Sequence, residues 1–278
     1  MTRYYFGIHK ASSTWLINIL NDVSKYMCYN HKHYHSRKIF NHNINKEVIE
    51  KRLDFLSFTN ADFETVKTIN TPYKGFHVIR DIRDIIVSSY FSHKNTHSDF
   101  MWPEINEYRK ELINLNKEEG IIATMSHLDC MYIDKEPVRI FDCLRNWDYE
   151  NENILEIKFE DITKYPYTIV PEIFNFLDLL EDNDLLKLLI SRFKHKFSNS
   201  KNDKIQLNTL LYFIYKHDFY FKSKGRKKGI TNDSSHYRKG ESGDWRNHLT
   251  DKHVKLIKEK YGDILIKTKY EKNQDWKL

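Results

Sequence analysis

Residues 4–15 read YYFGIHKASSTW and join a short apolar run to a polar loop. An apolar run of this length between polar residues is typical of a buried strand. Apolar residues then recur at helical spacing, at Leu16, Leu20, Val23 and Met27. The segment therefore predicts a strand, a loop over residues 9–15 and a helix.

The same arrangement returns twice along the chain. Apolar runs at residues 75–79 and 154–159 are each followed by a helical pattern, the second one after Pro166. Strands that alternate with helices predict an α/β fold, in which helices cover both faces of a central parallel sheet. Ligands of such sheets bind at the carboxyl ends of the strands. We therefore expect the functional residues in the loops that follow these three strands.

The composition indicates a globular protein. The 278 residues are 40% hydrophobic, and 18 Tyr and 17 Phe supply the burial that offsets the entropy lost on folding. This length allows one large domain or two small ones, and we expect one over residues 1–278. The sequence has no signal-peptide pattern, no run near the roughly 20 apolar residues of a membrane span, and no disulfide framework among three cysteines. We expect a cytoplasmic protein without a membrane span.

Three further regions carry helical patterns. Residues 104–148 are expected to be largely helical with one interruption at Gly120, and residues 182–197 to form an amphipathic helix. A last helix is expected to begin after Thr250, as its N-cap, and to end at Gly262, as its C-cap.

Basic residues are concentrated in one window. Residues 222–239 hold seven basic residues and one acid, a net charge of +6 that equals the net charge of the whole chain. We interpret residues 222–247 as a basic lid loop that faces an anion, either a nucleic-acid backbone or a phosphorylated cofactor. A solvated surface loop is the simpler alternative.

The loop at residues 9–15 is a second candidate anion site. A loop between a strand and a helix exposes backbone N–H groups at the positive end of the helix, and Lys10 and the hydroxyls of Ser13 and Thr14 add donors. A nucleoside-triphosphate loop has its lysine after a second glycine, whereas no glycine follows the lysine here. The alternative is that the hydroxyl residues from Ser12 onward only cap the helix.

This loop resembles the phosphosulfate loop of the cytosolic sulfotransferase family, Pro-Lys-Ser-Gly-Thr-Thr-Trp. The resemblance covers Lys10, Ser13, Thr14 and Trp15. At two positions the sequence departs from the pattern, because His9 stands for the proline and Ser12 for the glycine. If that glycine has a positive φ, Ser12 must carry strain or the loop must follow a different path.

Three more segments resemble this family, in the family's order. RDIRDIIVS at residues 80–88 is similar to Arg-Asn-Pro-Lys-Asp-Val-Ala-Val-Ser, and YRKGESGDWRNH at residues 237–248 to Arg-Lys-Gly-x-x-Gly-Asp-Trp-Lys-Asn-His. A weaker match places Phe159 where the family has a tyrosine that contacts adenine. For residues 80–88 the alternative is a strand-to-helix junction with a surface salt bridge between Arg80 and Asp84.

The resemblance implies a P-loop-NTPase-like core that binds 3′-phosphoadenosine 5′-phosphosulfate (PAPS) and transfers its sulfuryl group to an acceptor oxygen or nitrogen without a metal. Lys10 would stabilise the charge that leaves with the phosphate, Trp15 would stack on adenine, and Arg80 would hold the 3′-phosphate. The implied cofactor-binding residues are Lys10, Ser12, Ser13, Thr14, Trp15, Arg80, Ser88, Phe159, Arg238, Lys239 and Gly240.

An acceptor hydroxyl also needs a base. In the cytosolic sulfotransferases this base is a histidine on a strand between the two nucleotide motifs, but residues 56–60 contain no histidine. Related sulfotransferases place a glutamate base soon after the first helix, where this chain has His33 and His35. These two alternate onto one face of a strand, and we take both, with Lys10, as catalytic candidates.

Other interpretations of these residues stay open. Asp62 and Glu64 are further candidate bases, and the histidines at 31, 33 and 35 suggest a metal site or a solvated strand. His93 and His97 are expected in the wall of the acceptor pocket or at the surface.

Two other functions remain as alternatives to sulfuryl transfer. One is a nucleotide or small-molecule kinase with an atypical phosphate loop, and the other is a nucleic-acid-binding protein that uses the basic lid loop. We expect a small-molecule, lipid or glycan acceptor and no nucleic acid, and we leave a homodimer open.

Overall fold

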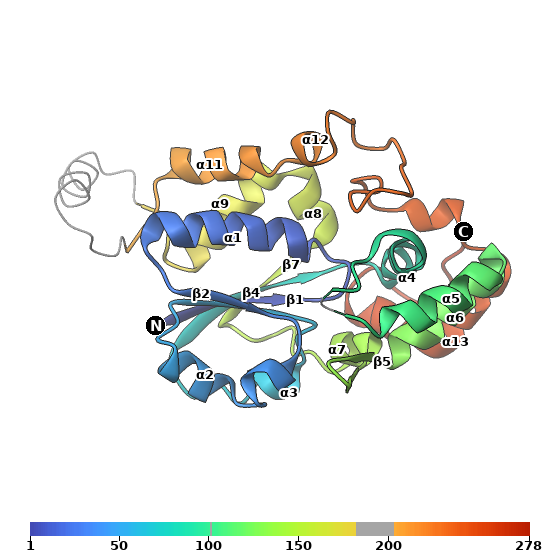
Figure 1. The fold of residues 1–278 in the computed structure, drawn as a ribbon, viewed down its shortest axis with the longest axis horizontal. Coiled ribbons are helices and arrows are strands. Elements are labelled where there is room, and N and C mark those ends of the chain that lie inside the picture. The colour runs from blue at the N-terminus through green and yellow to red at the C-terminus, as the bar shows by residue number, and fades with distance from the viewer. Residues whose placement is uncertain (101, 182–202) are drawn as a thin grey trace.

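A five-stranded parallel sheet forms the centre of the structure, a computed structural model that describes residues 1–100, 102–181 and 203–278 (Figure 1). The strand order is β2-β3-β1-β4-β7, and every neighbouring pair is parallel. The strands are β1 (Thr2–Gly7), β2 (His31–Tyr34), β3 (Phe55–Thr59), β4 (Tyr73–Ile79) and β7 (Ile154–Lys158). The predicted α/β fold with a central parallel sheet is confirmed.

The two faces of the sheet belong to two apolar clusters. In β1, Tyr5 packs in the cluster that contains the first helix, while Tyr4 and Phe6 pack in the cluster on the opposite face. All three side chains are fully buried. This burial on both sides explains why the strand reads as a continuous apolar run.

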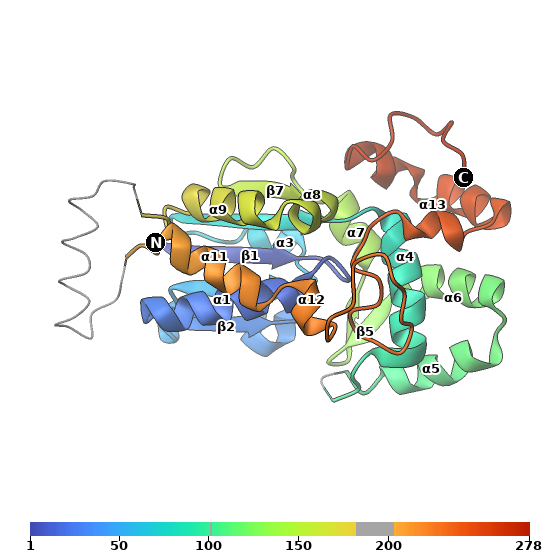
Figure 2. The same cartoon turned by 90° about the horizontal axis from the view of Figure 1, so that it is seen from above.

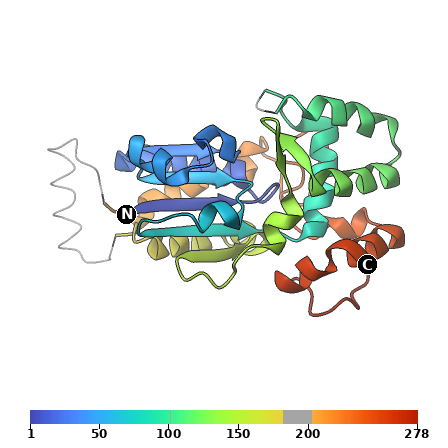
Figure 3. The same ribbon diagram turned by 90° about the horizontal axis from the view of Figure 1, so that it is seen from below.

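Helices cover both faces (Figures 1 and 3). One face carries α1 (Ser13–Met27), α8 (Phe159–Lys164), α9 (Pro166–Phe176) and α11 (Leu207–Lys216). The other carries α2 (Ile44–Glu50) and α3 (Phe63–Val66), and the short η1 (Arg37–Phe40) precedes α2.

The remaining elements lie beyond the carboxyl ends of the strands (Figure 2). They are α4 (Ile82–Phe91), η2 (Ser92–Thr96), α5 (Ile105–Asn114), α6 (Lys117–Asp129), α7 (Ile140–Arg145), α13 (Asp251–Lys267) and the hairpin of β5 (Met131–Ile133) with β6 (Glu136–Val138). The basic lid loop starts at the end of α12 (Phe219–Lys222), crosses this edge of the sheet and ends in η3 (Asp244–Asn247).

Two expected helix boundaries are wrong. Gly120 lies inside α6, and the break in this region comes at Leu115 and Asn116, whose side chain caps the Glu119 N–H at 3.0 Å. Thr250 does cap α13, but Gly262 lies within that helix. Both glycines face a neighbour, since an added Cβ would lie 2.6 Å from the Tyr90 ring and 2.9 Å from the Gln274 side chain, respectively. They mark close packing and not helix ends.

The expected helix at residues 182–197 lies outside the described residues. None of the helices in the described ranges has the length and apolar character needed to cross a bilayer.

Candidate active site

A cavity of about 750 Å³ opens at the carboxyl ends of the strands, in the range of small-molecule sites. Its lining includes residues from both the amino-terminal loop and the basic lid loop, which lie more than 200 positions apart. All the residues expected to bind the cofactor, and both histidines taken as catalytic candidates, line this one cavity: Lys10, Ser12, Ser13, Thr14, Trp15, His33, His35, Arg80, Ser88, Phe159, Arg238, Lys239 and Gly240.

The loop after β1 keeps the path of a glycine-containing loop although it lacks the glycine. Ser12 has φ 65° and ψ 15°, in the left-handed region, and Lys10 has φ 60°. Ser12 makes no side-chain cap bond, so the proposed capping role is not seen there. The first turn of α1 therefore presents its backbone N–H groups to the cavity edge, at the positive end of the helix. Serine bears the strain that glycine would avoid.

Arg80 joins the first two segments. Its Nη1 donates to the Lys10 carbonyl at 2.8 Å, and its guanidinium carbon lies 4.1 Å from the centre of the Phe159 ring. The alternative salt bridge to Asp84 is not what the structure shows. Asp84 instead accepts the backbone N–H groups of Gly243 and Trp245.

Asp244 holds the cations of the basic lid loop. Its carboxylate pairs with Arg238 and, at 2.6 Å, with the Lys239 ammonium, and its side chain is 4% exposed. Burial raises the pKa of Asp244, but hydrogen bonds from His248, Lys239, Asn247 and Arg238 outweigh it and hold that pKa well below its usual value. The loop is also tied to itself, because Arg226 donates to the carbonyls of Tyr237 and Arg238.

The cavity is strongly cationic around Lys10. Burial, and then the charges of Arg80 and Arg238, lower the pKa of the Lys10 ammonium to about 7. Arg80 Nε is buried and has no hydrogen-bond partner in the described part of the chain. Arg238 Nη1 is also buried and lies 3.6 Å from Asp233 Oδ1, an ion pair too long for a hydrogen bond. Three converging cations with free donors form a site for a multiply charged anion.

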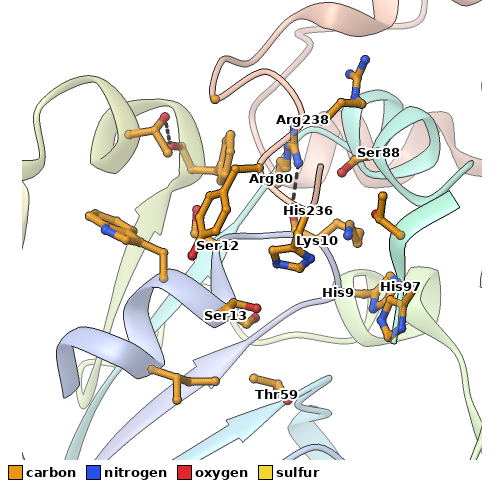
Figure 4. A pocket seen from close by; sticks show the side chains of 18 of the residues that line it. His9, Lys10, Ser12, Ser13, Thr59, Arg80, Ser88, His97, His236 and Arg238 are labelled. Atoms are coloured by element: carbon orange, nitrogen blue, oxygen red, sulfur yellow. Dashed lines mark hydrogen bonds between the residues drawn. The ribbon is translucent and has the colours of Figure 1, made fainter. Parts of the chain in front are cut away.

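The candidate bases lie beyond the phosphosulfate-like loop. His33 on β2 lies 3.1 Å from the Thr59 hydroxyl through its Nε2, and His35, one residue past the end of β2, lies 3.2 Å from Asp134 Oδ2 on the hairpin. In the view of Figure 4, Arg80, Arg238 and Ser88 lie on one side of Lys10 and Thr59 on the other.

The other candidate bases do not line the cavity. Asp62 caps α3 by accepting from the Thr65 N–H at 2.7 Å, and Glu64 pairs with Lys67 at the surface. No cluster suited to a metal occurs within the described ranges, including the histidines of β2.

Several residues that line the cavity were not predicted as site residues from the sequence. His9 and His236 line the cavity, as do Thr59, Asn60 and Trp102. His97 forms part of the wall as expected, whereas His93 is fully buried and its Nε2 lies 2.9 Å from His9 Nε2. Isolated histidines on loops have no spacing pattern that would mark them as site residues. His9 stood out only because it replaces the proline of the family's loop motif.

Comparisons with known proteins agree with this geometry. A model of the sulfotransferase domain matches residues 6–274. Sulfotransferases 2A2 and 2A1 of Mus musculus are each 27% identical over 215 residues, which cover 74% of this chain. The match spans 60% of the length of these curated relatives.

Two solved structures share the fold. Mouse sulfotransferase SULT7A1, complexed with PAP, superimposes with a TM-score of 0.53 at 16% identity, over 97% of this chain and 89% of the other. Retinol dehydratase, in complex with androsterone and inactive cofactor PAP, gives a TM-score of 0.51 at 13% identity, over 99% and 82%. With the domain model matching almost the whole length, this chain belongs to the sulfotransferase family.

Proposed function

We propose that this protein transfers the sulfuryl group of PAPS to a hydroxyl or amine of an acceptor. The observation that carries the proposal is the convergence of Lys10, Arg80 and Arg238 on one cavity from three separate segments. PAPS is negatively charged at both its 5′ and 3′ ends, and its adenine is flat. A cavity lined by several cations and by the aromatic rings of Trp15 and Phe159 suits such a molecule.

The residues present fit this cosubstrate. Arg80 Nε, which has no hydrogen-bond partner in the described residues, and Arg238 Nη1, which has only the ion pair with Asp233, would donate hydrogen bonds to the 3′-phosphate, together with Ser88, Lys239 and Gly240. Lys10 and the loop hydroxyls of Ser12, Ser13 and Thr14 would hold the 5′-phosphosulfate, with Trp15 and Phe159 beside adenine.

Sulfuryl transfer depends mainly on how the reacting groups are positioned and on stabilisation of the developing negative charge. Negative charge accumulates on the phosphate oxygen as the sulfuryl group leaves it, and a positively charged Lys10 beside that oxygen lowers the barrier. Bound anions also favour the charged form of Lys10, so the cosubstrate itself restores the charge that the free site disfavours.

The cations of the basic lid loop support a cofactor and not a nucleic acid as their partner. Arg238 and Lys239 line the cavity and pair with buried Asp244, and Arg226 binds carbonyls of its own loop. Lys228 also lines the cavity and donates to the Thr163 carbonyl, so three of the seven basic residues, Lys222, Lys224 and Lys227, are left for an outward-facing basic surface. A single domain over residues 1–278, a small-molecule, lipid or glycan acceptor, a homodimer and a cytoplasmic location are retained as proposals from the sequence.

Calorimetric titration with 3′-phosphoadenosine 5′-phosphate (PAP) and with adenosine monophosphate tests the function. We expect PAP to bind at least about 100-fold more tightly, because charge-assisted hydrogen bonds contribute about 1.5–3 kcal/mol each. Equal affinities, or binding of nucleic acid that weakens steeply with salt, would contradict the proposal. A kinase would instead prefer adenosine triphosphate with Mg²⁺ over PAP.

A further inference from the structure

The strand order separates two halves of the cavity. The cofactor-type residues follow β1, β4 and β7, whereas β3 and β2 extend the sheet on the other side of β1. Thr59 ends β3 beside Gly7, the last residue of β1, and its side chain lines the cavity. His33 lies on β2, one strand farther out. The acceptor half is therefore bounded by Thr59 and His33.

A chain of hydrogen bonds sets the tautomer of His33. Thr59 Oγ1 lies 3.3 Å from the Tyr34 carbonyl oxygen and 3.1 Å from His33 Nε2. A carbonyl only accepts, so the single hydroxyl proton of Thr59 points to Tyr34. The hydroxyl oxygen must then accept from His33, which places the proton of the neutral ring on Nε2. The lone pair of the ring is left on Nδ1.

That second nitrogen is left free by the described part of the protein. His33 is exposed and lines the cavity, and its Nδ1 makes no hydrogen bond to any residue that the structure describes. Desolvation by the surrounding walls, and then His35, lower the pKa of His33 to about 4, so the ring is neutral near pH 7. A neutral ring with an accessible lone pair is what an acceptor hydroxyl requires of a base.

We propose that His33 Nδ1 is the base that takes the acceptor proton, and that Thr59 is the positioning residue that keeps this nitrogen unprotonated. The inference rests on the proposed sulfuryl transfer. The acceptor oxygen bonds to sulfur as its proton moves to His33 Nδ1. The bond from sulfur to the 5′-phosphate oxygen breaks, and its electron pair leaves with PAP. The imidazolium then releases the proton to water.

His35 has a different attachment. Its Nε2 and Asp134 Oδ2 are 3.2 Å apart, and the Lys38 ammonium donates to the Asp134 carbonyl at 2.8 Å, so this group ties the loop after β2 to the hairpin. His35 is also the less exposed ring, at 17% for its side chain. These contacts assign His35 to the wall of the acceptor half.

The sheet contains a matched control for Thr59. One step back along the same two strands, His31 Nε2 lies 2.8 Å from the Ser57 hydroxyl, but neither residue lines the cavity. Thr59→Val and Ser57→Ala each remove a hydroxyl that faces a histidine. Thr59→Ser restores the hydroxyl at the acceptor side, and His33→Gln removes the base.

Nitrogen-15 NMR of the histidine-labelled, PAP-bound protein reads the tautomer without any acceptor. The His33 signals are those missing in His33→Gln. We expect wild type and Thr59→Ser to show the proton on Nε2, and Thr59→Val to shift toward the Nδ1–H form. Ser57→Ala should leave the His33 signals unchanged. An Nδ1–H form in the wild type, or no change in Thr59→Val, overturns the proposal.

Release of PAP, with substituted phenols and benzyl alcohols as probe acceptors, tests the catalytic step. We expect kcat to fall about 10²- to 10⁴-fold in His33→Gln and at least about tenfold in Thr59→Val, with smaller losses for phenols of low pKa. All variants should bind PAP as tightly as the wild type does. A wild-type protein that does not bind PAP would contradict the proposed function itself. If His35→Ala and Asp134→Asn lose turnover while His33→Gln keeps it, His35 is the base and the proposal is wrong.

Discussion

Asp84 Oδ2 accepts the backbone N–H of Gly243 at 2.6 Å, and Asp84 Oδ1 accepts that of Trp245 at 3.1 Å. Asp84 lies in the first turn of α4, four residues after Arg80, and is 2% exposed. The contact therefore fastens the end of the basic lid loop to the segment that carries Arg80. It sets the relative position of Arg80 and Arg238, the two arginines proposed to hold the 3′-phosphate.

Removing this contact should weaken both the fold and the site. In Asp84→Asn an amide N–H₂ faces one of the two backbone donors, which leaves a buried N–H unpaired at about 1–3 kcal/mol. We expect the free energy of unfolding in urea to fall by about that amount, and the affinity for PAP to fall with it. Asp275→Asn, at an exposed residue outside the basic lid loop, should change stability by less than about 0.5 kcal/mol and leave PAP affinity unchanged. Equal effects of the two variants would show that the Asp84 contact does not hold the loop.

The preference for the 3′-phosphate should depend on two arginines. Arg80→Ala and Arg238→Ala each remove a charge-assisted partner, so we expect PAP affinity to fall about 10- to 100-fold while that of adenosine monophosphate changes little. Lys227→Ala is the control, because Lys227 is exposed in the same loop and lies outside the cavity lining. Titration calorimetry measures all three, and a parallel loss for both nucleotides would argue against contact with the 3′-phosphate.

Lys10 should make PAP binding depend on pH. The pKa of Lys10 in the free protein is about 7, and a bound anion stabilises its charged form and raises that pKa. Binding at pH 8 should thus take up a proton, and affinity should fall up to about tenfold for each pH unit above 7. Below about pH 6 Lys10 is already charged, and this uptake disappears. Calorimetry in buffers of different ionisation enthalpy measures the proton count, which Lys10→Met should abolish.

Two glycines of the basic lid loop allow a paired test. Gly240 and Gly225 both have positive φ, 74° and 87°, but an added Cβ would lie 2.6 Å from the Phe219 ring at Gly240 and 3.6 Å from the Tyr220 hydroxyl at Gly225. Alanine at either position costs about 1–2 kcal/mol in backbone strain. Gly240→Ala should lose more, because the ring on α12 must also move, and its PAP affinity should fall. Urea unfolding and PAP titration of both variants test whether packing of Gly240 against the Phe219 ring stabilises the loop and the PAP site.

The periodicity of the sequence predicted three of the five sheet strands as independent elements. The runs near Tyr5, Phe76 and Ile157 are apolar on both faces and carry a strong local signal. β2, with the sequence HKHY, is polar and was expected as a strand only through a family resemblance. The hairpin of β5 and β6, with only three residues in each strand, was missed, since such short strands have no measurable period.

The helix boundaries predicted at two glycines were wrong for a related reason. Gly120 and Gly262 were interpreted as helix boundaries, but each one is required by a side chain from a distant segment, Tyr90 or Gln274. A single glycine gives the same local signal whether it ends a helix or makes room for a neighbour.

The order of residues alone determined the fold class, the family and the set of residues around the cofactor half of the cavity, because these rest on local periodicity and on short contiguous motifs. The tertiary structure decided which of these residues share contacts: Arg80 with the Lys10 carbonyl, Asp84 with Gly243, and Thr59 with His33. These pairs come from different strands and loops. Their meeting depends on strand order and register, which hydrogen bonds between distant segments establish only when the whole sheet has formed.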